Sequence, residues 1–273
     1  MRYSDIEGFK KHLIGRGLTI NTAKTYSEAV IDYYKRYRTI SKLSILEWKD
    51  GMAGRYKPQT IACRIKGMNA YLEYKGIDIH LSGIKLERIS HLDNVISVSD
   101  YHKLIKGLYS KGDIISLRWR LLYMTIAMTG MRVSEVRQLT VDHVLAGRSQ
   151  IYTKGGIYRT VLLPKRLVYE LRTYLSGINQ EDGYIFGSRP EKPYAIGSIE
   201  TRMKMHADEF RIPRDVMHPH SLRHLFGKNF MKNKGDITVL ADILGHASIG
   251  TTRIYTRRTL DEQMELLDKL VTW

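Results

Sequence analysis

The stretch MHPHSLRHLF, residues 217–226, sets His220 and Arg223 three positions apart among apolar residues. Residues with this spacing lie on the same face of an α-helix. The leucines and the phenylalanine around them predict that the helix packs against a core. Two interpretations of this segment alone remain open: a core histidine beside a surface arginine, or a pair of donors for one anion such as a phosphate.

The chain is strongly basic. Its 273 residues include 44 Lys and Arg against 28 Asp and Glu, a formal net charge of +16. Residues 1–90 hold 17 of the basic and 9 of the acidic side chains, so half of the surplus lies there and half in the remainder. A surplus of this size favours a polyanionic partner, and nucleic acid is the commonest. We therefore expect a polyanion that contacts both parts of the chain.

Cys63 is the single cysteine, which excludes an internal disulfide and a cysteine cluster for zinc and favours a reducing compartment. The first residues, MRYSDIEGFKKHLIG, carry charges throughout and lack the apolar core of a signal peptide. No apolar run approaches the roughly 18 residues that span a membrane. These features predict a cytoplasmic protein without a membrane segment.

Residues 1–88 show the pattern of a four-helix domain with short connections. The segments Ser4–Glu7 and Ser44–Glu47 have the form of capping boxes, and Pro58 suits the start of a helix. Thr19 or Asn21 can cap the second helix, whose tyrosines at helical spacing are typical of a core.

We expect a linker over residues 89–98 and a second domain over residues 99–273. Helical patterns cover about 99–111 and 114–128, after which the period changes in TVDHVLAGRSQIYTKGGIYRTVLLP, residues 140–164. Its β-branched and aromatic residues, divided by glycines, predict a three-stranded antiparallel sheet with tight turns. Beyond Pro164 we expect helices to the end of the chain. The predicted fold is therefore mainly α with a small antiparallel β-sheet.

Three further segments hold polar residues of chemical interest. TGMRVSEV has Arg132 where a loop enters a helix, YTKGGIYRTV has Lys154 at the tip of a predicted hairpin, and LADILGHASIGTTRIYTRR holds His246 and Tyr255. Each has an ordinary interpretation when taken alone. A lysine in a hairpin turn is usually solvated, and a Gly-His pair often ends a helix.

Taken together and in this order, the segments resemble the tyrosine recombinase (phage integrase) family. Its pattern is Arg, hairpin Lys, His-x-x-Arg, Leu-Gly-His and Tyr, found here as TGMRVSEV, TKGGIYR, HSLRH, LGH and IYT. TINTAKTYSEAV, residues 19–30, also resembles the family's core-binding domain, so the resemblance spans nearly the whole chain. It implies an N-terminal four-helix, SAM-like core-binding domain and a C-terminal α+β catalytic domain. We expect the short, Xer-like form without an arm-binding domain.

The residue types suit the binding of a phosphodiester, whose negative charge repels a nucleophile. Arg132 and Arg223 are planar forks that can hold and neutralise the nonbridging oxygens. His220 can donate to the same phosphate or accept the proton of the nucleophile. The resemblance places His246 beside the phosphate as another donor and gives Glu135 a supporting role, while an ordinary surface glutamate remains the alternative for Glu135.

Tyr255 is the expected nucleophile. Its phenol, with an ordinary pKa near 10, becomes reactive when cationic neighbours favour the phenolate, and its attack on phosphorus forms a phosphotyrosine ester. The departing oxygen must gain a proton, and Lys154 suits that role. The resemblance implies a link to the 3′ phosphate and a free 5′ hydroxyl, with no metal, ATP or other cofactor.

Our leading hypothesis is site-specific recombination of double-stranded DNA with inverted-repeat core sites, carried out by a homo-tetramer. One alternative is a type IB topoisomerase-like enzyme that nicks and reseals a single duplex. Another is a recombinase-derived DNA-binding regulator without catalysis. A metalloprotein is disfavoured because His218 and His220 are too close for a helical ligand pair and no carboxylate or cysteine cluster accompanies them.

The end of the chain, TLDEQMELLDKLVTW, has apolar residues at helical spacing and predicts a helix over residues 260–272. Two placements remain open for this helix. It can pack on its own domain, or it can dock on a neighbouring subunit in a DNA-bound tetramer.

Overall fold

The structure is a computed structural model that describes residues 3–85, 94–152, 158–246, 248–256, 264, 267–269 and 271. The chain divides into two compact units, Met1–Arg88 and Ile89–Trp273. The predicted hairpin tip with Lys154, most of the predicted helix 260–272 and part of the predicted linker 89–98 lie outside the described residues.

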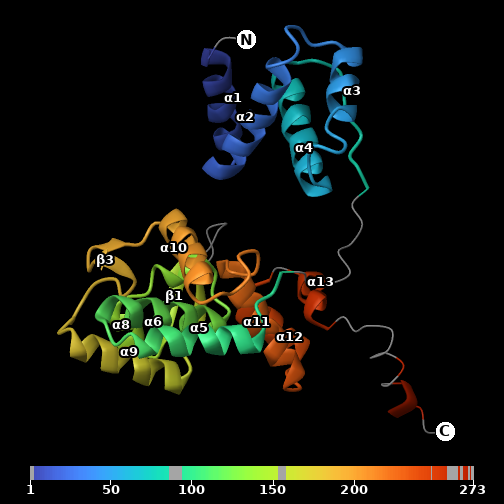
Figure 1. Ribbon diagram of the computed structural model, residues 1–273. Helices are drawn as coiled ribbons and strands as arrows, with labels where there is room; N and C mark the ends of the chain where they lie inside the picture. The colour runs from blue at the N-terminus through green and yellow to red at the C-terminus, as the bar shows by residue number, and fades with distance from the viewer. Residues whose placement is uncertain are drawn as a thin grey trace. The chain divides into compact units, whose positions relative to one another are not determined.

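The first unit is built from four helices, as predicted (Figure 1). They are α1 (Tyr3–Gly15), α2 (Ile20–Tyr34), α3 (Lys42–Asp50) and α4 (Pro58–Tyr74). Large aromatic residues fill the space between them, and Tyr33, Trp48 and Tyr71 are at most 1% exposed. The buried Tyr33 hydroxyl donates to the carbonyl of Thr39 at 2.8 Å, so its polar end is satisfied.

Serine and threonine caps set where α2 and α3 begin. Thr19 caps α2, because its Oγ1 accepts from the backbone N–H of Thr22 at 3.2 Å. The prediction that α3 begins at Ser44 is wrong. Ser41 is the cap, and its Oγ accepts from the N–H of Ser44 at 3.1 Å while Ser44 Oγ accepts from the N–H of Ser41 at 3.0 Å. Ser44 is therefore the third helical residue, closing a capping box rather than opening one.

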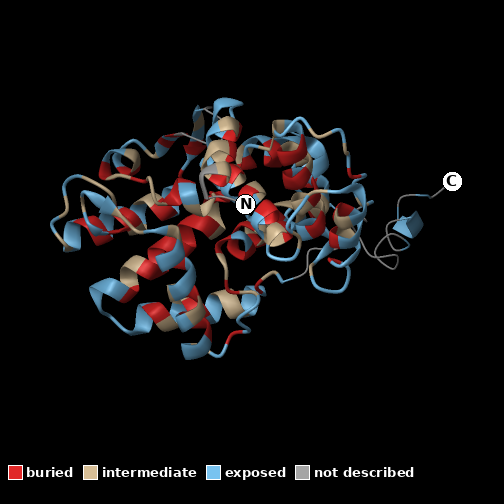
Figure 2. Cartoon of the chain, turned by 90° about the horizontal axis from the view of Figure 1, so that it is seen from above, coloured by how far each residue is buried: buried red, intermediate tan, exposed pale blue. Residues whose placement is uncertain are grey.

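The second unit surrounds one central helix. Its elements are α5 (Val98–Ser110), α6 (Ile114–Thr129), α7 (Val133–Val136), α8 (Val141–Leu145), β1 (Arg148–Tyr152), β2 (Tyr158–Leu162), α9 (Lys165–Gly177), β3 (Gly187–Arg189), β4 (Lys192–Pro193), α10 (Ile196–Glu209), α11 (Pro219–Lys232), α12 (Ile237–Leu244), α13 (Ile249–Thr252) and the 3₁₀ turn η1 (Arg253–Tyr255). Helix α6 packs against α5, α9 and α11. Helix α6 is buried along most of its length. Helices of the chain carry buried residues on one side and exposed residues on the other (Figure 2).

The predicted three-stranded sheet has two strands among the described residues. β1 and β2 pair antiparallel, from Arg148 opposite Leu162 to Tyr152 opposite Tyr158. The segment expected to form another strand is instead α8. Val141 and Val144, three positions apart, are both buried, so the apolar side chains follow the helical period rather than alternating. The β-branched residues of this short segment suggested the alternating pattern of a strand, which is wrong here.

A second, very short hairpin was missed in the sequence. β3 and β4 pair antiparallel with an irregular register, Gly187 opposite Pro193 and Arg189 opposite Lys192. Strands of three and two residues contain too few positions to show an alternating pattern. The expectation of helices alone after Pro164 was therefore wrong at this point.

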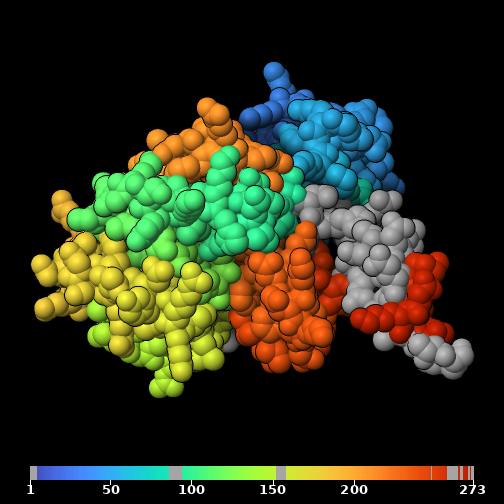
Figure 3. Space-filling view, turned by 60° about the horizontal axis from the view of Figure 1, so that its bottom comes forward, coloured from blue at the N-terminus to red at the C-terminus, as the bar shows by residue number. Residues whose placement is uncertain are grey.

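A small cavity of about 210 Å³ lies where α5, α6 and α9 meet. The surfaces of α5 and α6, in green, adjoin that of α9, in yellow (Figure 3). Arg120 on α6 pairs with both carboxylate oxygens of Glu170 on α9, at 2.8 and 3.2 Å, along the wall of this cavity. This two-point contact holds the two helices together.

Candidate active site

Two hydrogen bonds anchor the first turn of α11, one accepted by His218 and one by Ser221. His218 Nδ1 accepts from the backbone N–H of Ser221 at 3.1 Å and so caps the helix. Ser221 Oγ accepts from the backbone N–H of Ile96, 125 positions earlier, at 2.8 Å. The helix that carries Arg223 and His224 is thereby held at its start.

Arg223 is a buried cation, 3% exposed, held by the ends of two helices. Its Nη1 donates to the carbonyl of Gly130 at 2.6 Å, and its Nη2 donates to the carbonyl of Leu244 at 2.8 Å. Gly130 ends α6 and Leu244 ends α12, so the guanidinium lies at the negative ends of two helix dipoles. Burial and the nearby Arg132 still lower the pKa of Arg223 to about 10, so the side chain remains charged at neutral pH.

His246 lies directly against Arg223 and is held in one tautomer. Its Nε2 is 3.0 Å from Nη2 of Arg223, which can only donate, so Nε2 accepts. Its Nδ1 therefore carries the hydrogen and donates to Oγ1 of the buried Thr252 at 2.8 Å. Burial, followed by the charges of Arg223 and Arg132, lowers the pKa of His246 to about 4. In this arrangement His246 is a neutral acceptor, and donation from it to a phosphate requires the other tautomer.

Arg132 is tied to the buried carboxylate of Glu135. The backbone N–H of Arg132 donates to Glu135 Oε2 at 2.8 Å, and its Nη1 donates to Oε1 at 2.9 Å. A third contact runs from its Nη2 to the carbonyl of Gly245 at 3.4 Å. Glu135 is 1% exposed, so it is not an ordinary surface residue. The side chain of Arg132 is 33% exposed and can reach a ligand.

Arg159, on β2, is a site residue that the sequence analysis missed. Its Nη2 donates to Glu135 Oε2 at 2.8 Å and its Nη1 to the carbonyl of Ile243 at 2.6 Å. Burial lowers its pKa, and the charge of Glu135 acts in the opposite direction. Gly245 makes room for it, because a Cβ there would lie 2.8 Å from Nη1 of Arg159, on a backbone with φ of +61°. Arg159 thus joins the small sheet to Glu135 and to the end of α12.

Tyr255 is buried, 8% exposed, with its hydroxyl bonded to a second missed residue. Its Oη lies 2.9 Å from Nδ1 of His224. Its ring lies against Gly227, where a Cβ would come within 2.5 Å of the ring atom Cε1. Burial raises the pKa of Tyr255, while the charges of Arg223 and Arg132 act to lower it.

The structure brings most of the expected site residues together. Arg132 is bonded to Glu135 and Arg223 to His246, and the charges of both arginines act to lower the pKa of Tyr255, which burial raises. His220 is exposed, and the centre of its ring lies 6.4 Å from that of His224. Lys154 lies outside the described residues.

Neither a metal cluster nor a membrane-spanning helix is present in the part of the chain that the structure describes. No group of three or more His, Cys, Asp or Glu side chains there is arranged to hold a metal ion. No described helix is long and apolar enough to cross a membrane.

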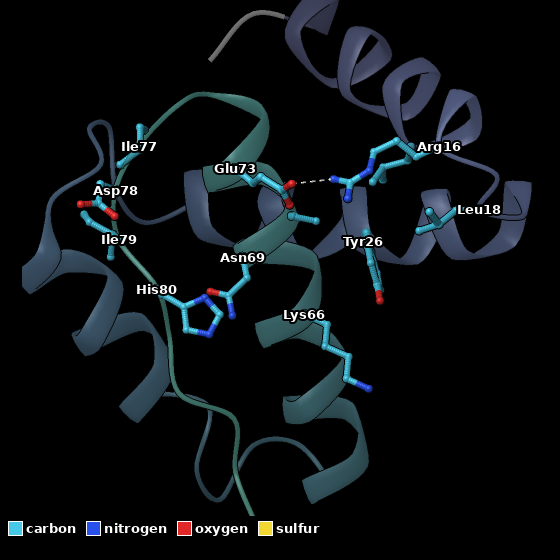
Figure 4. Close-up of a pocket in the computed structure, with 12 residues that line it drawn as sticks. Arg16, Leu18, Tyr26, Lys66, Asn69, Glu73, Ile77, Asp78, Ile79 and His80 are labelled. Atoms are coloured by element: carbon cyan, nitrogen blue, oxygen red, sulfur yellow. Dashed lines mark hydrogen bonds and ion pairs between the residues drawn. The ribbon is translucent and has the colours of Figure 1, made fainter.

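A separate depression of about 610 Å³ lies in the first unit (Figure 4). Arg16 donates to Glu73 at 2.9 Å across it, and the side-chain amide of Asn69 pairs with both backbone groups of Leu81 at 2.9 Å. Lys66, on α4, also lines it. Polar groups that line this depression are bonded within the first unit, with Lys66 beside them. None of the expected site residues lines it.

The geometry of the second unit defines a cationic site that can bind an anion beside a tyrosine. Solved structures share the fold of the chain. The structure of XerH site-specific recombinase bound to difH substrate aligns over 97% of this chain and 84% of the XerH chain, with a TM-score of 0.73 at 19% sequence identity. That of the Tn1549 transposon integrase in complex with transposon right end DNA covers 98% and 99%, with a TM-score of 0.71 at 14% identity.

Sequence comparisons identify the family. Residues 94–262, more than half of the chain, match the model described as the phage integrase family, and the chain belongs to that family. Tyrosine recombinase XerA of Pyrococcus furiosus is 24% identical over 98% of this chain and 94% of its own length. Tyrosine recombinase XerD of Listeria innocua is 27% identical over 90% of this chain and 91% of its own length. The predicted family, its class of enzyme, and a mainly helical fold with a small antiparallel sheet are confirmed.

Proposed function

We propose that the chain cleaves and rejoins double-stranded DNA at specific sites through a phosphotyrosine at Tyr255. The observation that carries the proposal is the arrangement of Arg223. Its buried, charged guanidinium is bonded to His246, and the charge of Arg132 helps to lower the pKa of Arg223. The charges of both arginines also act to lower the pKa of Tyr255. Two cations beside one phenol suit a phosphodiester that is attacked by that phenol.

The arginines and histidines bind the phosphate. Arg132, partly exposed and oriented by Glu135, supplies one fork to the nonbridging oxygens. Arg223 supplies the second charge from a position fixed by two helix ends. His220 and His246 donate to the same phosphate, His246 after its tautomer changes. Because the two arginines are already in place, little reorganisation of their charges accompanies the growth of negative charge.

The remaining groups carry out the bond exchange. The Tyr255 oxygen attacks the phosphorus, the 3′ phosphate becomes linked to the tyrosine, and the 5′ oxygen leaves with a proton from Lys154. A 5′ hydroxyl of another strand then reverses the attack and reseals the backbone. The ester conserves the energy of the broken bond, so the cycle consumes no ATP and requires no metal.

Both units contribute to DNA binding in this proposal. Residues 1–88 form the core-binding domain and residues 99–273 the catalytic domain, in keeping with the basic surplus in each part. The functional form is a homo-tetramer on inverted-repeat core sites, and the segment 260–272 docks on a neighbouring subunit. The protein acts in the cytoplasm.

A covalent-adduct assay tests the proposal. Duplexes that the protein binds are first selected from a random pool and then nicked at a series of positions, so that religation fails where a nick lies next to the cleavage point. We expect a protein–DNA species that survives denaturing electrophoresis in the presence of a metal chelator. Binding without any adduct on these nicked duplexes would instead support the non-catalytic regulator.

A further inference from the structure

The attack by Tyr255 requires a group that takes the proton of its hydroxyl. The structure has a candidate at hydrogen-bond distance. His224 follows Arg223 on α11, and its Nδ1 lies 2.9 Å from Oη of Tyr255. Among the hydrogen bonds of the described residues, this is the one made by the Tyr255 hydroxyl.

The direction of this hydrogen bond follows from the charge state of the two groups. Burial and then the neighbouring His220 lower the pKa of His224 to about 4, so the ring is neutral at neutral pH. Burial raises the pKa of Tyr255, so the phenol is protonated. The phenol therefore donates, and Nδ1 of His224 is the acceptor, with the ring hydrogen on Nε2. The proton already points at the nitrogen that would receive it.

Helix α11 also holds the ring that carries this hydroxyl. Gly227, three positions after His224 and thus on the same face, lies against the Tyr255 ring, and a Cβ there would come within 2.5 Å of it. One helix face therefore supplies both a gap for the ring and an acceptor for the hydroxyl. His220, which the sequence suggested as a proton acceptor, is exposed and lies one turn earlier on the helix.

We propose that His224 is a further catalytic residue, whose Nδ1 takes the proton of the Tyr255 hydroxyl as its oxygen attacks the phosphorus. The inference rests on the proposed function. In this step the bond from Oη to phosphorus forms while the O–H bond of Tyr255 breaks and its proton passes to His224. The bond from phosphorus to the 5′ oxygen breaks, and that oxygen keeps the electron pair and takes a proton from Lys154. In the reverse step the imidazolium of His224 returns its proton to the departing phenol oxygen.

The weak basicity of the resting imidazole does not prevent this role. A phenol oxygen that is forming a bond to phosphorus holds its proton far less tightly than a free phenol does. Transfer to His224 thus becomes favourable as the new bond develops, without a phenolate forming first. The bound phosphate also adds negative charge near Arg223, whose positive charge contributes, after burial and His220, to the weak basicity of His224 at rest.

Two substitutions separate proton transfer from mere positioning. His224→Phe keeps a ring but removes the acceptor. His224→Asn places an amide oxygen near the position of Nδ1, so it can accept the hydrogen bond but not the proton. His102→Asn, on the exposed surface of α5, is the matched control. For each we would measure the single-turnover rate of adduct formation on a nicked duplex, the affinity for that duplex, and the thermal midpoint.

We expect both His224 variants to form the adduct about 10²-fold more slowly, the usual scale of general-base catalysis. DNA affinity and the thermal midpoint should stay near the wild-type values, as should every property of His102→Asn. A duplex with sulfur in place of the leaving 5′ oxygen should not restore either variant, because the deficit lies on the attacking side.

Three results would overturn the inference while leaving the proposed function intact. A near-normal rate for His224→Asn would show that the hydrogen bond only positions the phenol, and a near-normal rate for His224→Phe would remove any role. Recovery with the sulfur-containing duplex would place His224 on the leaving side. Absence of adduct with the wild-type protein would instead overturn the proposed function, and this inference with it.

Discussion

Replacing Glu135 by Gln removes the carboxylate that joins Arg132 to Arg159. This carboxylate is 1% exposed and accepts from the Arg132 side chain at 2.9 Å and from the Arg159 side chain at 2.8 Å. The side chain of Arg159 is only 12% exposed, so its charge would remain buried without its carboxylate partner. We expect the variant to lose stability and, because Arg132 loses its orientation, to cleave DNA more slowly.

The size of the stability loss follows from the burial of this ion pair. Removing one partner of a buried pair costs about 3–5 kcal/mol. Arg132 is partly exposed and can be hydrated, so we take the lower end, about 3 kcal/mol. In a domain of this size each kcal/mol lowers the thermal midpoint by about 2–4 °C, which gives a shift of roughly 6–12 °C. Scanning calorimetry of the full chain would measure it in the transition of the second unit.

An exposed ion pair of the same unit supplies the control. Asp208 accepts from Arg214 at 3.2 Å, with both side chains more than half exposed. Asp208→Asn should therefore cost only about 0–1 kcal/mol. If Glu135→Gln lowers the midpoint by no more than Asp208→Asn does, the reasoning about the buried carboxylate is refuted.

Three further predictions concern the reaction itself. Arg223→Lys should slow adduct formation by about 10²–10³-fold, because one ammonium cannot bond both helix ends and still serve the phosphate, and a rate within a few-fold of wild type would contradict the clamp. Gly227→Ala should displace the Tyr255 ring and slow adduct formation. Gly197→Ala should not, because an added Cβ there meets nothing within 4 Å. Equal rates of adduct formation in the two variants would refute the close contact between Gly227 and the ring. Lys154→Ala should be slow on a normal duplex and recover on one with sulfur as the leaving atom, and failure to recover would remove Lys154 as the acid.

Local sequence features were sufficient to predict most of the helices. Asp113 opens α6 by accepting from the N–H of Ser116 at 2.8 Å, and Gly130 ends it in a left-handed conformation, both as their residue types suggest. The short elements were less predictable. In α8 the same valines suit a strand or a helix, and only their burial on one side against the core decides between the two.

The polar contacts of the site depend on the fold rather than on local sequence. The motifs drew attention to residues such as Arg132 and Arg223, but His224 meets Tyr255 across 31 positions and Arg159 meets Glu135 across 24. The segments TKGGIYR and HSLRH end at Arg159 and His224, but nothing in either segment indicates which distant residue this last side chain contacts. Their partners become apparent only when α11, β2 and the turn after α13 are placed in space.

Mapping the covalent adduct tests most directly whether Tyr255 becomes linked to DNA. The adduct formed on a nicked duplex would be digested with nuclease and trypsin, which releases residues 254–257 as one peptide. Mass spectrometry should find the 3′-phosphate remnant on Tyr255 in that peptide. Tyr255→Phe should form no adduct while binding the same duplex with nearly unchanged affinity. A remnant on any other residue, or an adduct formed by Tyr255→Phe, would contradict the account.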